Sequence, residues 1–199
     1  MRHGERQDAG KAEGEHVETR TVYRSPEALN EAERADIWEI LKMCDGDFYP
    51  PLSQRQSSYQ KTFAANTGEV SDEGPRAYFD EMIRQEFLLT YVGDEMVGFM
   101  TFRTGYEYEK MGPEYNPSLY MTTACVKHAW RERGIMGALY DMMDEMTKRF
   151  GCPAVTTRTW STNEAQMAML PRHGFRELCV LKDDRGPGVD TVYFGKIVI

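Results

Sequence analysis

The sequence lacks long apolar runs and closely spaced cysteines. Its four cysteines form no Cys-x-x-Cys pair, so their spacing predicts neither a zinc site nor a disulfide framework. No apolar stretch reaches the length of a membrane span, and residues 1–16 are polar, without the apolar centre of a signal peptide. These absences predict a cytoplasmic protein that keeps its cysteines reduced, holds no metal and does not associate with a membrane.

Positive charge is scarce as well. The chain has 24 lysines and arginines against 32 aspartates and glutamates, which gives a formal net charge of −8. Because lysine and arginine supply most of the non-specific affinity for phosphate backbones, this balance disfavours a nucleic-acid binder. It is compatible with a small cationic substrate.

The composition is otherwise that of a globular domain. With 199 residues, of which 41% are hydrophobic, the chain can bury a core without disulfide bonds. Residues 1–16 consist largely of charged residues and glycine and offer almost nothing to bury, so we expect a disordered leader there. The remaining residues, 17–199, are expected to form one domain.

Hydrophobic periodicity predicts the secondary structure. Runs of β-branched and aromatic residues predict strands at 16–24, 87–92, 96–102, 119–126, 154–160, 175–181 and 191–199. Three- and four-residue spacing predicts helices at about 26–41, 78–83, 135–150 and 163–170. Ser25 is the expected N-cap of the first helix, with Pro26 at its first position, and Pro171 is expected to end the last. This order predicts a mixed sheet with helices on both faces.

The segment between residues 126 and 139 carries the clearest functional signal. Gly134 and Gly137 fall at the start of a predicted helix, where the first amides have no intrahelical partner and the helix dipole is positive. Arg131 and Arg133 lie beside them and can donate charge-assisted hydrogen bonds to an anion. The pattern favours a phosphate site, although two glycines at a helix start are also common as turns or caps.

Two widespread phosphate loops do not fit this segment. No Gly-Lys-Ser or Gly-Lys-Thr follows the glycines, which excludes a Walker-type loop. A dinucleotide fingerprint places three glycines near the first strand of a βαβ unit, whereas this segment lies past the middle of the chain.

The same segment resembles the acetyl-CoA loop of the GNAT superfamily of N-acetyltransferases. That loop reads (Arg or Gln)-x-x-Gly-x-(Gly or Ala) and follows a long central strand, as Arg131 and Gly134 follow the strand predicted at 119–126. Met136 stands where the family has its second small residue, and Gly137 comes one place later. The loop is therefore either shifted or roomier on one side, and its backbone amides would still point at a pyrophosphate.

Two further features support the resemblance. Asn163 with the later Gly174 and Phe175 resembles the family's Asn…Gly-Phe signature, and a hairpin ending in Val97-Gly98 resembles the family's Val-Gly hairpin. The element order matches over roughly residues 17–199, with residue-level support at about 87–175. The resemblance implies a GNAT-like α/β (α+β) fold: a mixed, mostly antiparallel central sheet of about six to seven strands with helices on both faces.

The resemblance also implies a site for acetyl-CoA as cosubstrate. The central strand would pair with the pantetheine arm and offer an amide to the thioester carbonyl, and the loop would hold the pyrophosphate. The residues implied in this binding are Thr123, Ala124, Cys125, Val126, Arg131, Glu132, Arg133, Gly134, Ile135, Met136, Gly137 and Asn163. For Asn163 a helix N-cap is an equally weighted role, because asparagine is among the preferred N-cap residues.

The groups that transfer protons are less well marked. Many relatives carry a tyrosine that protonates the leaving thiolate at the position of Leu170, and often a glutamate at the position of Tyr120. Tyr120 is our candidate for proton transfer or for positioning a water, since a tyrosine with an ordinary pKa of about 10 is a poor base. Glu107, Glu109 and Glu114 are the alternative carboxylates.

A covalent mechanism is disfavoured. Cys125 in the middle of a strand has no recognisable His and Asn or Asp partners, and a small core residue is the more typical role for such a cysteine. His128 and His173 are expected at the surface or in loops.

The resemblance implies direct transfer of an acetyl group from acetyl-CoA to an amine of a small molecule or peptide. Leu170 and Tyr120 motivate an alternative, a non-catalytic acyl-CoA-binding or sensing module. A third hypothesis is chemistry that depends on a dinucleotide. The acceptor would contact residues 48–74 and 106–117, whose sequences specify no particular amine. A homodimer is compatible with such a domain.

Overall fold

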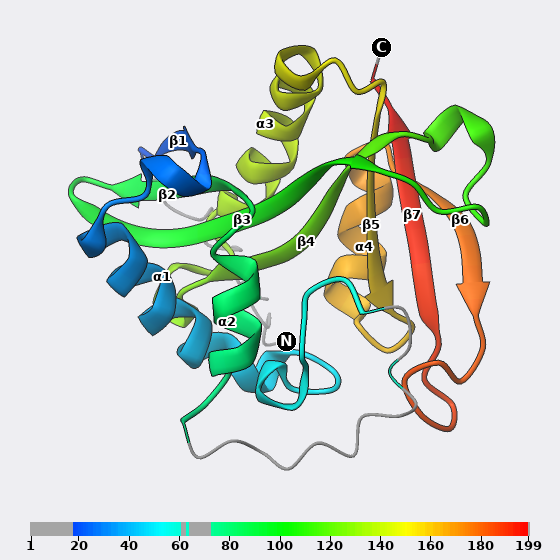
Figure 1. Cartoon of the computed structure of the whole chain (residues 1–199), viewed down its shortest axis with the longest axis horizontal. Helices are drawn as coiled ribbons and strands as arrows, with labels where there is room; N and C mark the ends of the chain where they lie inside the picture. Colours follow the sequence, from blue (N-terminus) through cyan, green and yellow to red (C-terminus); the bar gives the residue numbers. More distant parts are fainter. Residues whose placement is uncertain (1–17, 61–62, 64–72, 199) are drawn as a thin grey trace, which may run out of the picture.

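The structure, a computed structural model, describes residues 18–60, 63 and 73–198. Seven strands form one sheet in the order β1-β2-β3-β4-β5-β7-β6 (Figure 1). The strands are β1 (Arg20–Arg24), β2 (Glu86–Val92), β3 (Glu95–Tyr106), β4 (Ser118–Val126), β5 (Ala154–Trp160), β6 (Arg176–Leu181) and β7 (Thr191–Ile197). The α-helices of the described residues are α1 (Glu31–Cys44), α2 (Arg76–Met82), α3 (Ile135–Phe150) and α4 (Glu164–Arg172). The predicted leader at 1–16 lies outside the described part.

The sheet is mixed and mostly antiparallel, which confirms the predicted fold class. Every pair of neighbouring strands is antiparallel except β4 and β5, which run parallel because α3 connects the end of one to the start of the other. β2 and β3 form a hairpin whose turn contains Gly93 with a left-handed φ of 56°.

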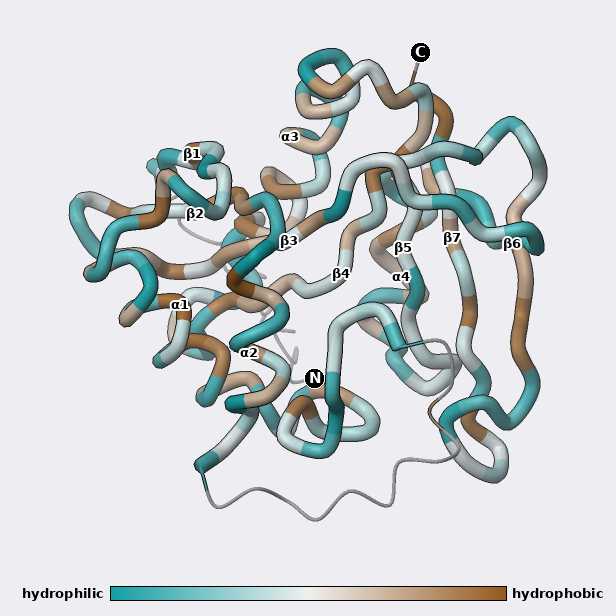
Figure 2. The backbone as a smooth tube through the Cα atoms, in the orientation of Figure 1, coloured by the Kyte–Doolittle hydropathy of each residue, from teal (hydrophilic) through white to brown (hydrophobic). Residues whose placement is uncertain are grey.

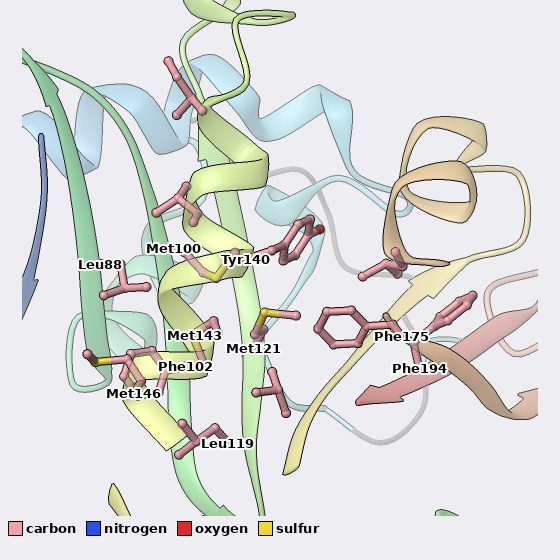
Figure 3. Close-up of a cluster of buried hydrophobic side chains, with 14 of the residues drawn as sticks. Leu88, Met100, Phe102, Leu119, Met121, Tyr140, Met143, Met146, Phe175 and Phe194 are labelled. Atoms are coloured by element: carbon pink, nitrogen blue, oxygen red, sulfur yellow. The ribbon is translucent and has the colours of Figure 1, made fainter. Parts of the chain in front are cut away.

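Helices cover both faces of the sheet. On one face, α1 and α2 bury Ile37, Ile40, Leu41, Tyr78 and Met82 against strand residues that include Phe87, Leu89 and Phe99. On the other, α3 and α4 bury the cluster that Figure 3 shows in part, with Leu139, Tyr140, Met143, Met146 and Leu170 against Leu88, Met100, Phe102, Leu119 and Met121. Brown and teal segments alternate along α1 in Figure 2, as an amphipathic helix requires. None of the described helices is long and apolar enough to cross a membrane.

The start of the first helix differs from the prediction. Pro26 lies in a separate 3₁₀ turn, Pro26–Ala28, and the Ser25 side chain makes no capping bond. α1 begins only after Asn30, whose side chain accepts a hydrogen bond from the Glu33 amide at 2.8 Å while the Glu33 carboxylate accepts one from the Asn30 amide at 3.1 Å. This reciprocal capping box satisfies two amides, whereas Ser25 satisfies none.

The end of the last helix also differs. Pro171 lies inside α4, which continues to Arg172, although we expected the proline to end the helix. The reason is position: a proline in the last turn removes one hydrogen bond near the C-terminus, where the carbonyls need other partners in any case. The Leu170 carbonyl accepts bonds from the amides of His173 and Phe175, each at 3.1 Å.

The two parallel strands separate partway along their length. β4 pairs with β5 only from Ser118 to Met121, so residues 122–126 have no partner strand on that side within the described part of the chain. Next to the separation, Thr101 pairs with Thr123 and Phe102 with Met121, which leaves Thr122 as the extra residue of a β-bulge. Figure 1 shows β4 and β5 close at their upper ends and diverging below. The opening exposes backbone amides and carbonyls in the middle of a sheet.

Candidate active site

A cavity of about 540 Å³ occupies the opening between β4 and β5. Its walls come from these two strands, α3, α4 and the turn that follows α1. Of the residues predicted to bind the cofactor, those that line it are Thr123, Ala124, Cys125, Val126, Arg131, Glu132, Gly134, Ile135, Met136, Gly137 and Asn163. Arg133 lies outside the walls, with its guanidinium 5.0 Å from the centroid of the Trp130 ring, which does line the cavity.

The start of α3 presents free amides to the cavity. Gly134 is the N-cap, with φ 80°, and its carbonyl accepts the first intrahelical bond from the Ala138 amide at 3.1 Å. The amides of residues 135–137 therefore have no partner within the helix. Glu132 is also left-handed, with φ 61°, so the loop bends sharply just before the helix. This geometry, together with the helix dipole, makes an anion site.

Arg131 points back toward the sheet. Its Nε donates to the Val126 carbonyl at 3.1 Å, and a terminal nitrogen lies 2.5 Å from Asp47 Oδ2, in the turn after α1. His128 Nε2 is 3.1 Å from the same oxygen. Although desolvation opposes it, hydrogen bonding to Arg131 and His128 lowers the pKa of Asp47. Arg131 thus fixes the loop to β4 and α1 while it lines the cavity.

One group of residues has the donor atoms of a metal site. Atoms of Cys44, Asp47 and His128 all lie within 4.8 Å of one another, in the described part of the chain. Arg131 donates to two of them, since its terminal nitrogen is also 3.6 Å from Cys44 Sγ. A guanidinium already neutralises this acidic position, so we interpret the group as the anchor of Arg131.

Cys125 has the environment of a core thiol. It is 2% exposed and packs with residues of α1 and α2. Burial raises the pKa of its thiol well above the ordinary value, which keeps it protonated at neutral pH. A protonated, enclosed thiol is a poor nucleophile, in line with the low weight that the sequence gives to covalent catalysis.

Asn163 has one of the two roles that the sequence suggests, that of a helix N-cap. It is the N-cap of α4, with its Oδ1 accepting from the Gln166 amide at 3.2 Å and its Nδ2 donating to Thr159 Oγ1 at 3.1 Å. It also lines the cavity. The capping bonds are present in the structure, and contact with a pantetheine arm stays a prediction.

Tyr120 is not brought together with the other predicted site residues. Its side chain is 1% exposed, lies outside the cavity walls, and stacks on Tyr106 with ring centroids 4.1 Å apart. Burial raises the pKa of its hydroxyl. The alternative carboxylates Glu107, Glu109 and Glu114 are exposed and also lie outside the walls.

The structure reveals a second tyrosine that the sequence did not single out. Tyr140 of α3 lines the cavity and donates a hydrogen bond from its hydroxyl to Gln166 Oε1 of α4. Figure 3 shows its ring reaching out from α3 with the hydroxyl at the far end. Burial raises the pKa of this hydroxyl, so it holds its proton at neutral pH. The sequence does contain one signal for Tyr140: its side chain carries a hydroxyl but lies among the apolar residues of the helix predicted at 135–150.

Thr122, the bulged residue of β4, belongs to a polar network behind the cavity. Its hydroxyl donates to Gln85 Oε1 at 2.5 Å, and the Gln85 amide donates to Ser58 Oγ at 2.6 Å and to Glu81 Oε1 at 2.8 Å. The network joins the cavity wall to α2 and to the segment after α1. These residues are far apart in sequence, so no local pattern predicts their contact.

Solved structures of similar fold share little sequence with the chain. A putative acetyltransferase of the GNAT family from Desulfovibrio desulfuricans is similar with a TM-score of 0.63 and 12% identity, over 90% of this chain and 100% of that one. YncA, a putative acetyltransferase from Salmonella typhimurium with its cofactor acetyl-CoA, is similar with a TM-score of 0.59 and 14% identity, over 90% of this chain and 94% of that one. A putative streptothricin acetyltransferase from Bacillus anthracis has a TM-score of 0.49 and 14% identity, and this partial match spans 57% of this chain and 62% of that one.

Sequence comparison identifies the family. A search among curated proteins finds no match. A family model described as "Acetyltransferase (GNAT) family" matches residues 52–175, a range that contains the central strand, the α3 loop and Asn163. Because this match covers more than half of the chain, the protein belongs to the GNAT family of acetyltransferases.

Proposed function

We propose that the protein transfers the acetyl group of acetyl-CoA directly to an amine of a small molecule or peptide. Membership of an acetyltransferase family makes the chain an acyltransferase with acetyl-CoA as its cosubstrate. The amine acceptor and the direct transfer are the finer part of the proposal. The supporting observation is that one cavity contains both the free amides at the start of α3 and the unpaired edge of β4.

These two features suit the two ends of CoA. The pyrophosphate is an anion and would lie at the amides of residues 135–137, beside Gly134, where a Cβ atom would meet nothing within 4 Å. The pantetheine arm contains amides and would pair with the free edge of β4 at residues 122–126, as an added strand pairs with a sheet edge. This arrangement directs the thioester toward the point where β4 and β5 meet.

The reaction needs no covalent intermediate on the protein. The neutral amine nitrogen attacks the thioester carbon and the carbon–sulfur bond breaks. The nitrogen releases one proton to solvent as it becomes an amide, and the sulfur leaves as a thiolate that takes up a proton. Tyr140 lines the cavity with a protonated hydroxyl and is our candidate donor, in place of the tyrosine that relatives carry at the position of Leu170. Its hydroxyl proton can rotate away from Gln166 and is restored from solvent after transfer.

Tyr120 is a weaker candidate than Tyr140 for donating a proton to the thiolate. It stands outside the cavity walls, and its ring stacks on that of Tyr106. We keep it as a positioning residue: Tyr120 packs with Tyr193, and that hydroxyl accepts a hydrogen bond from Arg158 on the cavity wall at 3.2 Å.

The test is release of free CoA from acetyl-CoA across a panel of amines. We expect release that saturates with one class of amine and is absent without it. Saturable binding of acetyl-CoA with no release for any amine would replace the enzyme by the non-catalytic binding module. Binding of NAD or NADP, measured by calorimetry in parallel, would favour the dinucleotide hypothesis, and we expect none.

A further inference from the structure

Three arginines surround a single aromatic ring beside the cavity. Arg55 follows the turn after α1, Arg158 lies in β5 and Arg185 lies in the turn between β6 and β7. Their guanidinium carbons are 5.1, 4.8 and 4.2 Å from the centroid of the Phe63 ring. Arg55 and Arg185 are each only 6% exposed. We call these three residues the arginine cluster.

The cluster has no ionic partner among the described residues. Its members are absent from every ion pair of that part of the chain. Arg158 donates to the Gln60 carbonyl at 2.6 Å, and Arg185 to the Tyr49 carbonyl at 2.5 Å. The nearest link to a carboxylate is indirect, because Arg185 donates to the Thr191 hydroxyl, which in turn donates to an Asp184 oxygen.

Arg55 leaves one terminal nitrogen unsatisfied. Its Nε donates to the Pro50 carbonyl at 2.9 Å, but its Nη2 is buried and has no hydrogen-bond partner in the described structure. An unpaired buried donor on a charged group is costly, and most such groups in native proteins have a partner. This nitrogen therefore marks a place for an acceptor that the described residues do not supply.

The arginines of the cluster do not lose their positive charge by releasing a proton. Burial and then the neighbouring arginines lower the pKa of Arg185 to about 9, and burial above all lowers that of Arg55 to about 10, so both stay cationic at neutral pH. The Phe63 ring offers each cation only a quadrupole, which is a weaker partner than an anion. Three cations that form no ion pair with the described residues attract a negatively charged group.

The cluster adjoins the cavity through Arg158. Arg158 itself lines the cavity, together with Phe48 and Trp160. The Arg55 guanidinium lies 5.4 Å from the Phe48 ring, and that of Arg185 lies 5.4 Å from the Trp160 ring. In Figure 1 the turn after α1 and the turn between β6 and β7 both lie toward the lower end, where β4 and β5 diverge. The cluster thus stands behind one wall of the proposed reaction site.

We propose that the acceptor amine carries an anionic group, a carboxylate or a phosphate, which the arginine cluster binds, and an apolar part that contacts Phe48 and Trp160. This inference rests on the proposed function for the amine itself. It departs from the cationic acceptor suggested by the net charge of −8, because the charge beside the cavity has the opposite sign to that of the whole chain. Arginine suits the task, since its planar fork matches both carboxylate and phosphate oxygens.

The first experiment compares amines that differ only in the anionic group. L-phenylalanine against phenethylamine tests a carboxylate, and O-phosphoethanolamine against ethanolamine tests a phosphate, each by CoA release from acetyl-CoA. We expect kcat/KM to be at least about tenfold higher for the anionic member of one pair, and the pair identifies the group. Equal or better use of both neutral amines would overturn the proposal.

The second experiment changes the cluster. Arg55→Met is expected to raise the KM for the preferred anionic amine at least about tenfold, with Arg55→Lys recovering part of the loss. The KM for acetyl-CoA reports on the folded cofactor site and should not change. Arg176→Met removes an exposed arginine of β6 and serves as the matched control. Because an apolar side chain can replace an unpaired buried charge without loss of stability, we expect Arg55→Met to melt no lower than the wild type. An unchanged KM in Arg55→Met would reject the cluster as the anion site.

A binding measurement separates this inference from the proposed function. The four amines are added to the protein with CoA, and the melting temperature is recorded for wild type and Arg55→Met. We expect the anionic member of one pair to raise the melting temperature of the wild type only, since a ligand stabilises the state that binds it. That result without any CoA release would retain the anion site and reject the transferase. Equal shifts for anionic and neutral amines would reject the anion site, whatever the turnover.

Discussion

Gly134 is the residue on which the cofactor site depends most. Its left-handed φ of 80° favours glycine, while the space around it is open. Gly134→Ala should therefore cost about 1–2 kcal/mol of unfolding free energy through backbone strain and keep most of the affinity for CoA. Gly134→Glu has the same strain and adds a negative charge at the anion site, so its Kd for CoA should rise at least about tenfold, or about 1.4 kcal/mol.

Calorimetric titration with CoA and urea unfolding of both variants check this prediction. The alanine variant is the matched control, because it has the strain without the charge. Equal CoA affinity in the two variants would place the pyrophosphate elsewhere.

Tyr140 is the second decisive residue. Tyr140→Phe removes the hydroxyl and keeps the ring, which packs on Phe175 with centroids 5.8 Å apart, so the fold should persist. If the hydroxyl protonates the thiolate, kcat should fall at least about tenfold, the lower end of what a general acid contributes. The KM for acetyl-CoA should change little.

The measurement is kcat with the best amine, with Tyr120→Phe assayed in parallel. A drop in kcat for Tyr120→Phe alone would return the proton-transfer role to Tyr120. Full activity of Tyr140→Phe from pH 7 to pH 9 would remove Tyr140 from the chemistry.

At the scale of elements, the site depends on the contact between the turn after α1 and the loop after β4. Asp47 lies in the first and Arg131 in the second, and the Asp47 side chain is 38% exposed. Such a partly exposed ion pair contributes up to about 1 kcal/mol. Because hydrogen bonding lowers the pKa of Asp47 in the folded state, the contribution is complete above the ordinary value of about 4 and is lost as the pH falls through the lowered value.

Asp47→Asn tests this contact. We expect the variant to be less stable than the wild type by up to about 1 kcal/mol at pH 7, with the difference shrinking as the pH falls below about 4. Urea unfolding at pH 7, 5 and 3 gives the three differences. If the stability difference between the two proteins stays constant down to pH 3, the charge of Asp47 is not what joins the turn after α1 to the loop after β4.

The elements were predictable where one periodic signal dominates. α3 has apolar residues at helical spacing between Gly134 and Gly151, and the structure gives the bounds that the pattern predicts. α1 was predicted several residues too early, because Ser25 and Pro26 resemble a helix start while the reciprocal bonds of Asn30 and Glu33 set the actual one. Ser25 and Asn30 are both residues that can cap a helix. Which of them does so depends on hydrogen bonds that only the structure shows.

The site was predictable only in its local part. The loop from Arg131 to Gly137 is continuous in the chain, so spacing and a family resemblance suffice to find it, and the cavity includes most of it. Tyr140 and Arg158 were missed because each reads as an ordinary position of a helix or a strand. Their role depends on residues from distant segments, such as Gln166 and Gln60, and only the tertiary structure brings these together.

At the scale of the whole molecule, net charge and local charge point in different directions. The chain is acidic, with a formal charge of −8, yet the described residues beside the cavity include three arginines without an ionic partner. Net charge governs solubility and long-range attraction, whereas recognition depends on the groups within a few ångströms. A substrate prediction from composition alone therefore carries little weight for a buried site.

We propose that the cavity between β4 and β5 joins an amine directly to the acetyl group of acetyl-CoA. The most direct test is mass spectrometry of the products, with free CoA measured in the same reaction and Gly134→Glu as the control. We predict one N-acetylated amine for each CoA released by the wild type, and at least about tenfold less of both products from the variant when acetyl-CoA is kept below the wild-type Kd. Release of CoA without an acetylated amine would exclude direct transfer to the amine, and equal yields from both proteins would exclude this cavity as the place of transfer.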